Sequence, residues 1–225
     1  MNKTKGLIFT ASLVLATTFT ISCEDKEDKN KFTDSRDGKT YKKVTIGSQT
    51  WMAENLNFAA EGSKCGDENN RLADNNTAYC DEYGRLYDWN TAMKACPSGW
   101  HLPSDNEWTE LMNFLVSNKE EVRYEEYEET GEKFCSNAGK YLKSKSGWRS
   151  DRNGTDEFGF SALPGGDGYS HGQFSSVGDD GNWWSAYDYE GHSNYACIWT
   201  IHNDNNIRWG NMYKSSLNSI RCIQN

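Results

Sequence analysis

The stretch Cys96-Pro97-Ser98-Gly99-Trp100-His101-Leu102-Pro103-Ser104-Asp105-Asn106-Glu107-Trp108 decides the local structure at the centre of this chain. Pro97 ends a preceding helix, because proline has no N–H to donate and its ring clashes with the turn before it. Ser104 and Glu107 have the S-x-x-E spacing of a capping box, in which each side chain accepts a hydrogen bond from the other residue's backbone N–H. The apolar residues that follow recur at helical spacing: Trp108, Leu111, Met112 and Leu115. We therefore expect a helix from just after Ser104 to about residue 118.

Length and charge limit the classes of protein to consider. The 225 residues suit one well-cored domain with an N-terminal extension, and 9 Trp, 12 Tyr and 9 Phe provide large side chains to bury. A mean hydropathy of -0.89 excludes a protein with many membrane spans. The formal net charge of -9 disfavours binding to phosphate backbones, so we expect no nucleic-acid partner.

The N-terminal segment has the pattern of an export signal. Lys3 and Lys5 precede an apolar run over residues 7–21, and Thr20-Ile21-Ser22-Cys23 resembles a bacterial lipobox. We expect residues 1–22 to be a lipoprotein signal peptide and Cys23 to carry the lipid. The alternative is a plain signal peptide with an incidental cysteine. Residues 23–38 are rich in charge and poor in apolar side chains, which predicts a flexible tether. The domain is then residues 39–225, anchored in the bacterial outer membrane and exposed at the cell surface.

The rest of the chain predicts short strands around two helices. Residues 41–46 and 49–52 predict a hairpin around Gly47, and residues 57–83 a polar loop. Leu86, Trp89, Met93 and Cys96 predict one helical face. Residues 119–133 contain seven Glu and predict a solvated helix–loop excursion. The glycine-rich, aromatic region after residue 147 predicts strands at 195–202, 207–213 and 219–223. The fold class is therefore α+β, with short antiparallel strands and long glycine-rich loops.

Six blocks of sequence carry a resemblance to a known family. They are residues 44–56, 83–87 and 99–103, then Phe158-Gly159-Phe160-Ser161-Ala162-Leu163-Pro164-Gly165-Gly166, Trp183-Trp184-Ser185 and Ser219-Ile220-Arg221-Cys222. In this order they resemble the Fibrobacter succinogenes major paralogous domain, which implies a C-type-lectin-like fold. The stretch from His101 to Trp108 is also similar to formylglycine-generating, sulfatase-modifying enzymes, but a shared fold does not transfer activity.

Six cysteines remain after Cys23, and an even number in an exported chain predicts disulfides. Spacing alone does not choose among the fifteen pairings that six cysteines allow. The lectin-like resemblance implies a bond between the first long helix and the last strand, hence Cys96 with Cys222. It leaves Cys65 with Cys80 across one loop, and Cys135 with Cys197 by elimination.

The chain lacks the sequence patterns of common catalytic sites, including the nucleophile elbow, the H-E-x-x-H motif, the Walker loop and the dinucleotide fingerprint. His101 at the helix entry is most simply a hydrogen-bonding residue, and His171, His192 and His202 are scattered. We expect no metal and no cofactor. Calcium stays an open alternative, because two groups offer oxygen ligands: Asp67, Glu68, Asn69, Asn70, Asp74 and Asn75, and Asp179, Asp180, Asn182, Asp204 and Asn205.

Aromatic residues in the predicted loops are the candidates for ligand binding. Tyr169, Tyr187, Tyr189 and Trp209, together with Trp148, could stack on a sugar ring or a partner, and core packing is the alternative for each. We expect a non-catalytic, lectin-like adhesion module for an extracellular glycan or protein ligand. One alternative is an enzyme related to the sulfatase-modifying proteins, which requires a free, accessible thiol at Cys197 or Cys222. The other is an architectural envelope protein that binds copies of itself.

Overall fold

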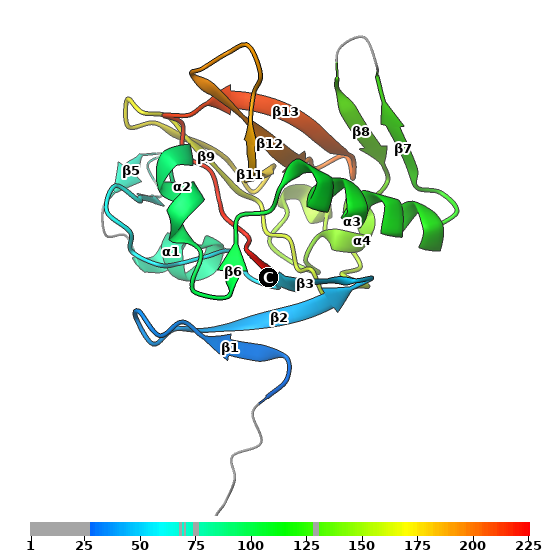
Figure 1. Ribbon diagram of the computed structural model, residues 1–225, viewed down its shortest axis with the longest axis horizontal. Helices are drawn as coiled ribbons and strands as arrows, with labels where there is room; N and C mark the ends of the chain where they lie inside the picture. Colours follow the sequence, from blue (N-terminus) through cyan, green and yellow to red (C-terminus); the bar gives the residue numbers. More distant parts are fainter. Residues whose placement is uncertain (1–27, 68, 70, 74–76, 128–130) are drawn as a thin grey trace, which may run out of the picture.

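Two β-sheets make up most of the folded body, as the computed structural model in Figure 1 shows. The structure describes residues 28–67, 69, 71–73, 77–127 and 131–225. In this part of the chain four short α-helices accompany the sheets, so the protein is mostly β. This agrees with the predicted α+β class, although the share of strand is larger than the sequence suggested.

The smaller of these two sheets has the strand order β1-β2-β3-β14-β6. Its strands are β1 (Lys31–Thr33), β2 (Thr40–Ile46), β3 (Gln49–Met52), β14 (Ile223–Gln224) and β6 (Trp100–His101). The predicted hairpin is confirmed, because Ile46 pairs with Gln49 and Gly47 takes the positive φ of +62° that the tight turn requires. β14 pairs with β3 and with β6, so the end of the chain closes this sheet between its two halves.

The larger sheet has the order β10-β9-β11-β12-β13-β8-β7. Its strands are β10 (Phe174–Val177), β9 (Gly165–Gly168), β11 (Gly181–Asp188), β12 (Tyr195–Ile201), β13 (Ile207–Tyr213), β8 (Lys133–Ser136) and β7 (Arg123–Glu126). Neighbours are antiparallel except β9 and β11. Two of the three late strands lie where the sequence predicts them, at β12 and β13, whereas the third is reduced to β14.

The helices are α1 (Thr77–Tyr83), α2 (Trp89–Ala95), α3 (Asp105–Asn118) and α4 (Gly139–Leu142), and a 3-10 turn covers Arg149–Asp151. α3 confirms the predicted helix and its capping box: Ser104 Oγ accepts from Glu107 N at 3.3 Å, and Glu107 Oε2 accepts from Ser104 N at 2.7 Å. None of the described helices is long and apolar enough to cross a membrane.

The prediction that Leu86, Trp89, Met93 and Cys96 lie on one apolar face of a helix is wrong. α2 has seven residues and begins after Asp88, whose carboxylate caps it, so Leu86 lies before the helix. Met93 is 44% exposed, whereas Ala92 and Ala95 are the residues that α2 buries. The small side chains of these alanines allow the helix to lie close to the rest of the domain. A pattern of large apolar residues at helical spacing does not include such alanines.

Two segments that the sequence assigns to loops contain regular structure. Within residues 57–83 lie β4 (Cys65–Gly66), β5 (Leu72–Ala73) and α1. The Glu-rich residues 119–133 contribute β7 and the start of β8, so the expected helix–loop excursion is wrong. Val122, just before β7, and Cys135 on β8 are buried in the main core, and this packing favours strands over the helical preference of glutamate.

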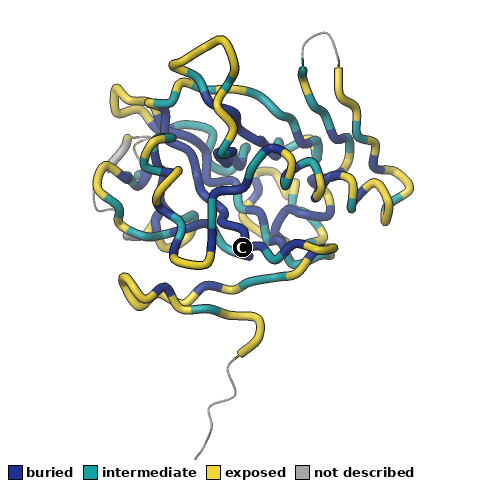
Figure 2. Tube along the Cα trace, viewed as in Figure 1, coloured by how far each residue is buried: buried dark blue, intermediate teal, exposed yellow. Residues whose placement is uncertain are grey.

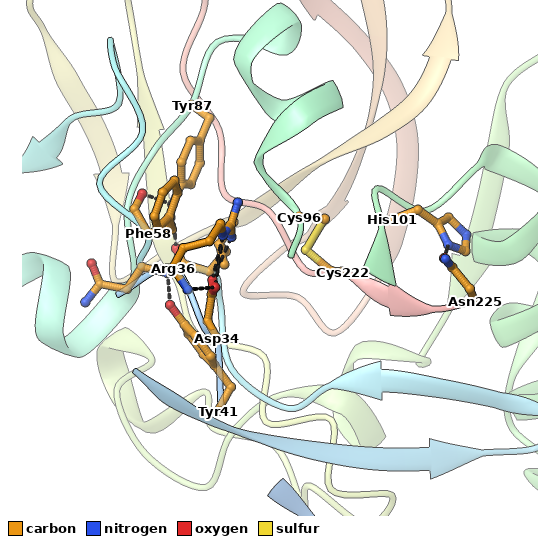
Figure 3. The surroundings of a disulfide bond; sticks show 11 residues. Asp34, Arg36, Tyr41, Phe58, Tyr87, Cys96, His101, Cys222 and Asn225 are labelled. Atoms are coloured by element: carbon orange, nitrogen blue, oxygen red, sulfur yellow. Dashed lines mark hydrogen bonds and ion pairs between the residues drawn. A yellow bond between two sulfur atoms is a disulfide. The ribbon is translucent and has the colours of Figure 1, made fainter. Parts of the chain in front are cut away.

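The folded body begins before residue 39, which corrects the predicted boundary. β1 pairs with β2, and Asp34 is buried and forms an ion pair with Arg36 at 2.6 Å. The Arg36 guanidinium lies 3.8 Å from the centre of the Phe58 ring. Figure 3 shows these two side chains next to each other. Residues 31–38 are therefore part of the domain and not of a tether. The predicted signal peptide and Cys23 lie outside the described residues.

The main core lies between α3 and the two sheets and is built from aromatic rings. Trp108 of α3 lies 4.9 Å from Trp51, 6.0 Å from Trp199 and 6.3 Å from Trp183, measured between ring centres. All four are essentially inaccessible to solvent. In Figure 2 the buried trace runs through this centre, while the turns at the rim are exposed. The stripe predicted on α3 is thus the face that closes the core.

Two predicted disulfides are present and the third is not. Cys65 is bonded to Cys80, and Cys96 is bonded to Cys222 (Figure 3). Cys135 and Cys197 are free and buried. They lie on β8 and β12, with β13 between them, and their partners on β13 are Ile207 and Asn211. Two strand spacings and a four-residue offset separate them by roughly 16 Å, far beyond the span of a disulfide. Pairing by elimination ignored this strand order.

Candidate functional site

A hollow of about 480 Å³ lies where four parts of the fold meet. The start of α3, the β7–β8 hairpin, the end of β11 with the residues that follow, and β13 each supply part of its wall. Its aromatic residues are Tyr187, Tyr189 and Trp209. Its charged residues are Asp105, Glu126, Lys133 and Glu190. The volume is in the range of small-ligand sites, and the mixture of rings and a few polar groups is typical of them.

Asp105 organises the wall of this hollow. It is the first residue of α3 and is 6% exposed. Its Oδ1 accepts hydrogen bonds from Trp199 Nε1 at 2.9 Å and from Trp209 Nε1 at 3.0 Å, and its Oδ2 accepts from Lys133 Nζ at 2.5 Å. The carboxylate therefore holds the Trp209 ring in one orientation and ties the β7–β8 hairpin to the start of the helix.

The electrostatics of the hollow are those of a neutral wall with an acidic rim. Burial disfavours the charge on Lys133, but the ion pair with Asp105 outweighs this effect and raises the pKa of Lys133, so the lysine stays protonated beside the carboxylate. At the rim, the hydrogen bond to Glu190 raises the pKa of Tyr187. Glu126 and Glu190 are exposed, and they leave the hollow negative. An anionic ligand is therefore disfavoured.

Three of the four predicted ligand residues meet in this hollow. Tyr187 is 40% exposed there, and Tyr189 and Trp209 lie 6.0 Å apart between ring centres. Tyr169 lies elsewhere, next to His171 after β9, and does not line the hollow. Trp148, the further stacking candidate, is 4% exposed and hydrogen-bonded to Ala162 O, so it is a core residue.

The sequence reasoning missed the polar part of the site. Asp105 stands inside the helix-capping stretch, where its position in the sequence indicates only local structure. Glu126 and Lys133 come from the Glu-rich segment, whose composition predicts a solvated face and not a binding site. The signal that could have found them is the placement of one lysine among glutamates next to aromatic residues, but only the pairing of β8 with β13 brings them to Trp209.

Residues from four of the six sequence blocks meet in the interior and not at the hollow. Asn55 Oδ1 accepts from Trp183 Nε1 at 2.8 Å, from Arg221 Nη2 at 2.8 Å and from Arg221 Nε at 3.2 Å. Arg221 also donates to the carbonyls of Phe160 and Ser161. Asn55, Trp183 and Arg221 are buried, and burial lowers the pKa of Arg221 to about 9. We refer to Asn55, Phe160, Trp183 and Arg221 as the Asn55 node.

The comparison with family models matches residues 44–224 to the Fibrobacter succinogenes major domain. The chain belongs to this family. The match spans both sheets, the aromatic core and the Asn55 node, while β1 precedes it. Searches of the curated proteins and of the solved structures found no match.

In this Fibrobacter succinogenes major domain the histidines do not gather in one place. His101 confirms the predicted hydrogen-bonding role, because its Nδ1 lies 2.7 Å from Asn225 Oδ1 and its Nε2 lies 2.7 Å from Glu107 Oε1 (Figure 3 shows His101 beside Asn225). His202 pairs with Asp180, and His171 and His192 stack on tyrosines.

Four of the five residues in the second group of calcium candidates are held by other side chains, whereas the side-chain oxygen of Asn205 is buried without a hydrogen-bond partner among the described residues. Asp179 pairs with Arg149, Asp180 with His202, and Asp204 with Arg208. Asn182 Oδ1 accepts from Thr200 inside the sheet. Across the described residues no three His, Cys, Asp or Glu side chains are grouped to hold a metal ion. The first group, at residues 67–75, falls partly outside the described residues.

The thiols required by the sulfatase-modifying alternative are not accessible. Cys222 is part of the disulfide with Cys96, and Cys197 is fully buried on β12. Burial raises the pKa of Cys197 to about 12, and it raises the pKa of Cys135 to about 12 as well. Thiols of this kind are protonated at neutral pH and unreactive. Their surroundings are those of small apolar core residues.

Proposed function

We propose that this domain is a non-catalytic binding module whose ligand is a neutral glycan. The observation that carries the proposal is the hollow between α3, the β7–β8 hairpin and β13, where Tyr187, Tyr189 and Trp209 stand beside hydrogen-bonding groups. Aromatic rings offer a flat apolar contact for the carbon-bound face of a sugar, and the polar groups beside them can bind its hydroxyls. The Asp105 hydrogen bond to Trp209 favours binding, because it orients this ring before the ligand arrives.

The charge of the site supports a neutral sugar over an acidic one. Lys133 is neutralised by Asp105, and the remaining charges at the rim, Glu126 and Glu190, are negative. A uronic acid, a sulfated sugar or a phosphate would meet this field unfavourably. A basic peptide would complement the negative rim. Binding of such a peptide in place of a glycan would replace the glycan as the proposed ligand.

We place this module at the outer surface of a bacterial outer membrane, lipid-anchored through Cys23, with a C-type-lectin-like fold. The supports are the export signal and lipobox in the sequence, the two disulfides, and the family. A bacterial lipoprotein carries at least two acyl chains, and two chains give stable anchoring where one gives marginal binding. Growth in labelled palmitate tests the anchor, since Cys23→Ser abolishes incorporation if the lipid is attached there.

The test of the ligand is a glycan array with the purified full chain in a detergent that has no sugar headgroup. We expect binding to neutral glycans, lost in Tyr187→Ala and Trp209→Ala. Tyr169→Ala is the matched control, because Tyr169 is 36% exposed against 40% for Tyr187 yet lies outside the hollow. Binding that Tyr169→Ala abolishes and Tyr187→Ala leaves intact would contradict the site. An array without binding, together with capture of lysine-rich peptides by the wild type, would replace the glycan by a protein ligand.

A further inference from the structure

Aromatic rings continue beyond the hollow in an unbroken row. Trp209 and Tyr189 lie 6.0 Å apart, Tyr189 and His192 5.2 Å, His192 and Tyr195 6.0 Å, and Tyr195 and Tyr213 4.3 Å, each measured between ring centres. His192 is exposed, and Tyr213, at 56%, is the most exposed of the large apolar residues in the described part of the chain. We name these five residues the aromatic row. A row of this kind is unusual on the surface, where large rings normally occur singly.

The backbone shows how far the row extends. Trp209 and Tyr213 are on the same strand, β13, and lie four positions apart in the sequence, so they face the same side of the sheet about 13 Å apart. Asn211 lies between them on that side and is exposed. The residues between β11 and β12, which carry Tyr189 and His192, protrude from the body at the upper edge of Figures 1 and 2. The row therefore offers a ring, an amide and a ring in sequence along β13.

A second hollow begins where the row ends. It has a volume of about 800 Å³, and Tyr213 is part of its lining. Its charged residues already have partners: Asp88 caps α2 through Thr91, and Lys214 pairs with Asp188 at 2.8 Å. The other polar groups are neutral amides and hydroxyls, among them Asn90, Ser193 and Asn194. The side chains of these three have no hydrogen-bond partner among the described residues.

We infer that the ligand is a linear, neutral oligosaccharide that lies along the aromatic row and reaches from the first hollow into the second. This inference rests on the proposed function and specifies its ligand as an extended chain, not a terminal sugar. Rings spaced along about 13 Å exceed what one sugar unit contacts, so several units stack in succession. The amides and hydroxyls of the second hollow then bind the hydroxyls of the distal units.

Calorimetric titration of the full chain tests this with ladders of cello-, manno-, xylo- and malto-oligosaccharides, each from the disaccharide to the hexasaccharide. We expect the hexasaccharide of the bound series to bind roughly tenfold more tightly than the disaccharide. Tyr213→Ala removes most of this gain and leaves the disaccharide affinity unchanged. Tyr127→Ala is the matched control, because Tyr127 is 50% exposed and lines neither hollow.

The outcomes separate the two proposals. Equal affinity for disaccharide and hexasaccharide, or a length gain that Tyr213→Ala leaves intact, overturns the extended ligand while the first hollow remains a glycan site. Loss of disaccharide binding in Trp209→Ala with no effect of Tyr213→Ala on any length has the same meaning. Absence of binding to every ladder overturns both proposals.

Discussion

Replacing Asn55 with leucine removes the one oxygen that accepts hydrogen bonds from both Trp183 and Arg221. The two side chains have similar volume, so the change is mainly the loss of polar partners. No carboxylate contacts Arg221 among the described residues, and its remaining partners are the carbonyls of Phe160 and Ser161. Depriving a buried charge of its partner costs about 3–5 kcal/mol, and an unpaired buried N–H costs about 1–3 kcal/mol. We expect Asn55→Leu to lower the free energy of unfolding by about 4 kcal/mol.

Arg221→Met separates the charge from the rest of the node. It removes the cation and leaves Asn55 bonded to Trp183, so only two carbonyls lose partners and the expected cost is about 2 kcal/mol. The double variant contains no buried charge that could be left without a hydrogen-bond partner. Its cost should therefore not exceed that of Asn55→Leu alone, which corresponds to a coupling energy of about 2 kcal/mol or more.

Urea unfolding under oxidising conditions, followed by tryptophan fluorescence, measures this cycle for all four proteins. The wild-type stability of a domain this size is about 5–15 kcal/mol, so a loss of about 4 kcal/mol is measurable. The reasoning is refuted if Asn55→Leu costs less than about 1 kcal/mol. It is also refuted if the cost of the double variant equals the sum of the two single-variant costs to within about 0.5 kcal/mol. Such additivity would mean that Asn55 does not stabilise the buried charge of Arg221.

Three further predictions concern groups away from the node. Lys143 is fully buried, and burial lowers its pKa to about 8. The unfolded chain therefore binds the proton more tightly, so the stability of the wild type relative to Lys143→Met should rise by about 3 kcal/mol from pH 8 to pH 10.5, and a flat difference in urea unfolding would contradict this. Cys96→Ser removes a disulfide between residues 126 positions apart and should lower the free energy of unfolding by about 5 kcal/mol in the same assay. A substitution of a free cysteine lacks this contribution, because a free cysteine closes no loop. Intact-mass alkylation of the unreduced chain should modify Cys135 and Cys197 after denaturation but leave them unmodified in the native protein.

The features that the sequence predicts well are those that depend on neighbouring residues. The capping box of Ser104 and Glu107 lies within one turn, and α3 forms where it indicates. The hairpin around Gly47 depends on a two-residue turn, and it too forms in the predicted register. The Cys96–Cys222 bond is long-range, and it was found through the family resemblance, not through spacing.

The features that the sequence does not predict depend on strand order. Elimination predicts a bond between Cys135 and Cys197, but β13 separates their strands. The Glu-rich segment has helical composition, yet Val122 is buried in the main core, and the β7–β8 hairpin joins the edge of the larger sheet. Three of the four candidate aromatic residues meet in the hollow because β11 and β13 both flank β12. Tyr169 is likewise an aromatic residue in a predicted loop, but it follows β9, which lies next to the opposite edge of the larger sheet.

Scaffold and ligand site draw on different parts of the chain, and this limits what family membership implies. The Asn55 node is built from residues of the blocks that define the family resemblance, and the Cys96–Cys222 bond uses Cys222 from the last of these blocks. The aromatic and acidic lining of the first hollow comes from the β7–β8 hairpin, from Tyr187 at the end of β11 and the residues after this strand, and from β13, and these lining residues lie outside those blocks. Asp105 connects the two, since it begins the capped helix and orients Trp209. A chain can therefore keep the node and the helix start, and so keep the fold, while a different hairpin or a different residue at 209 changes what it binds.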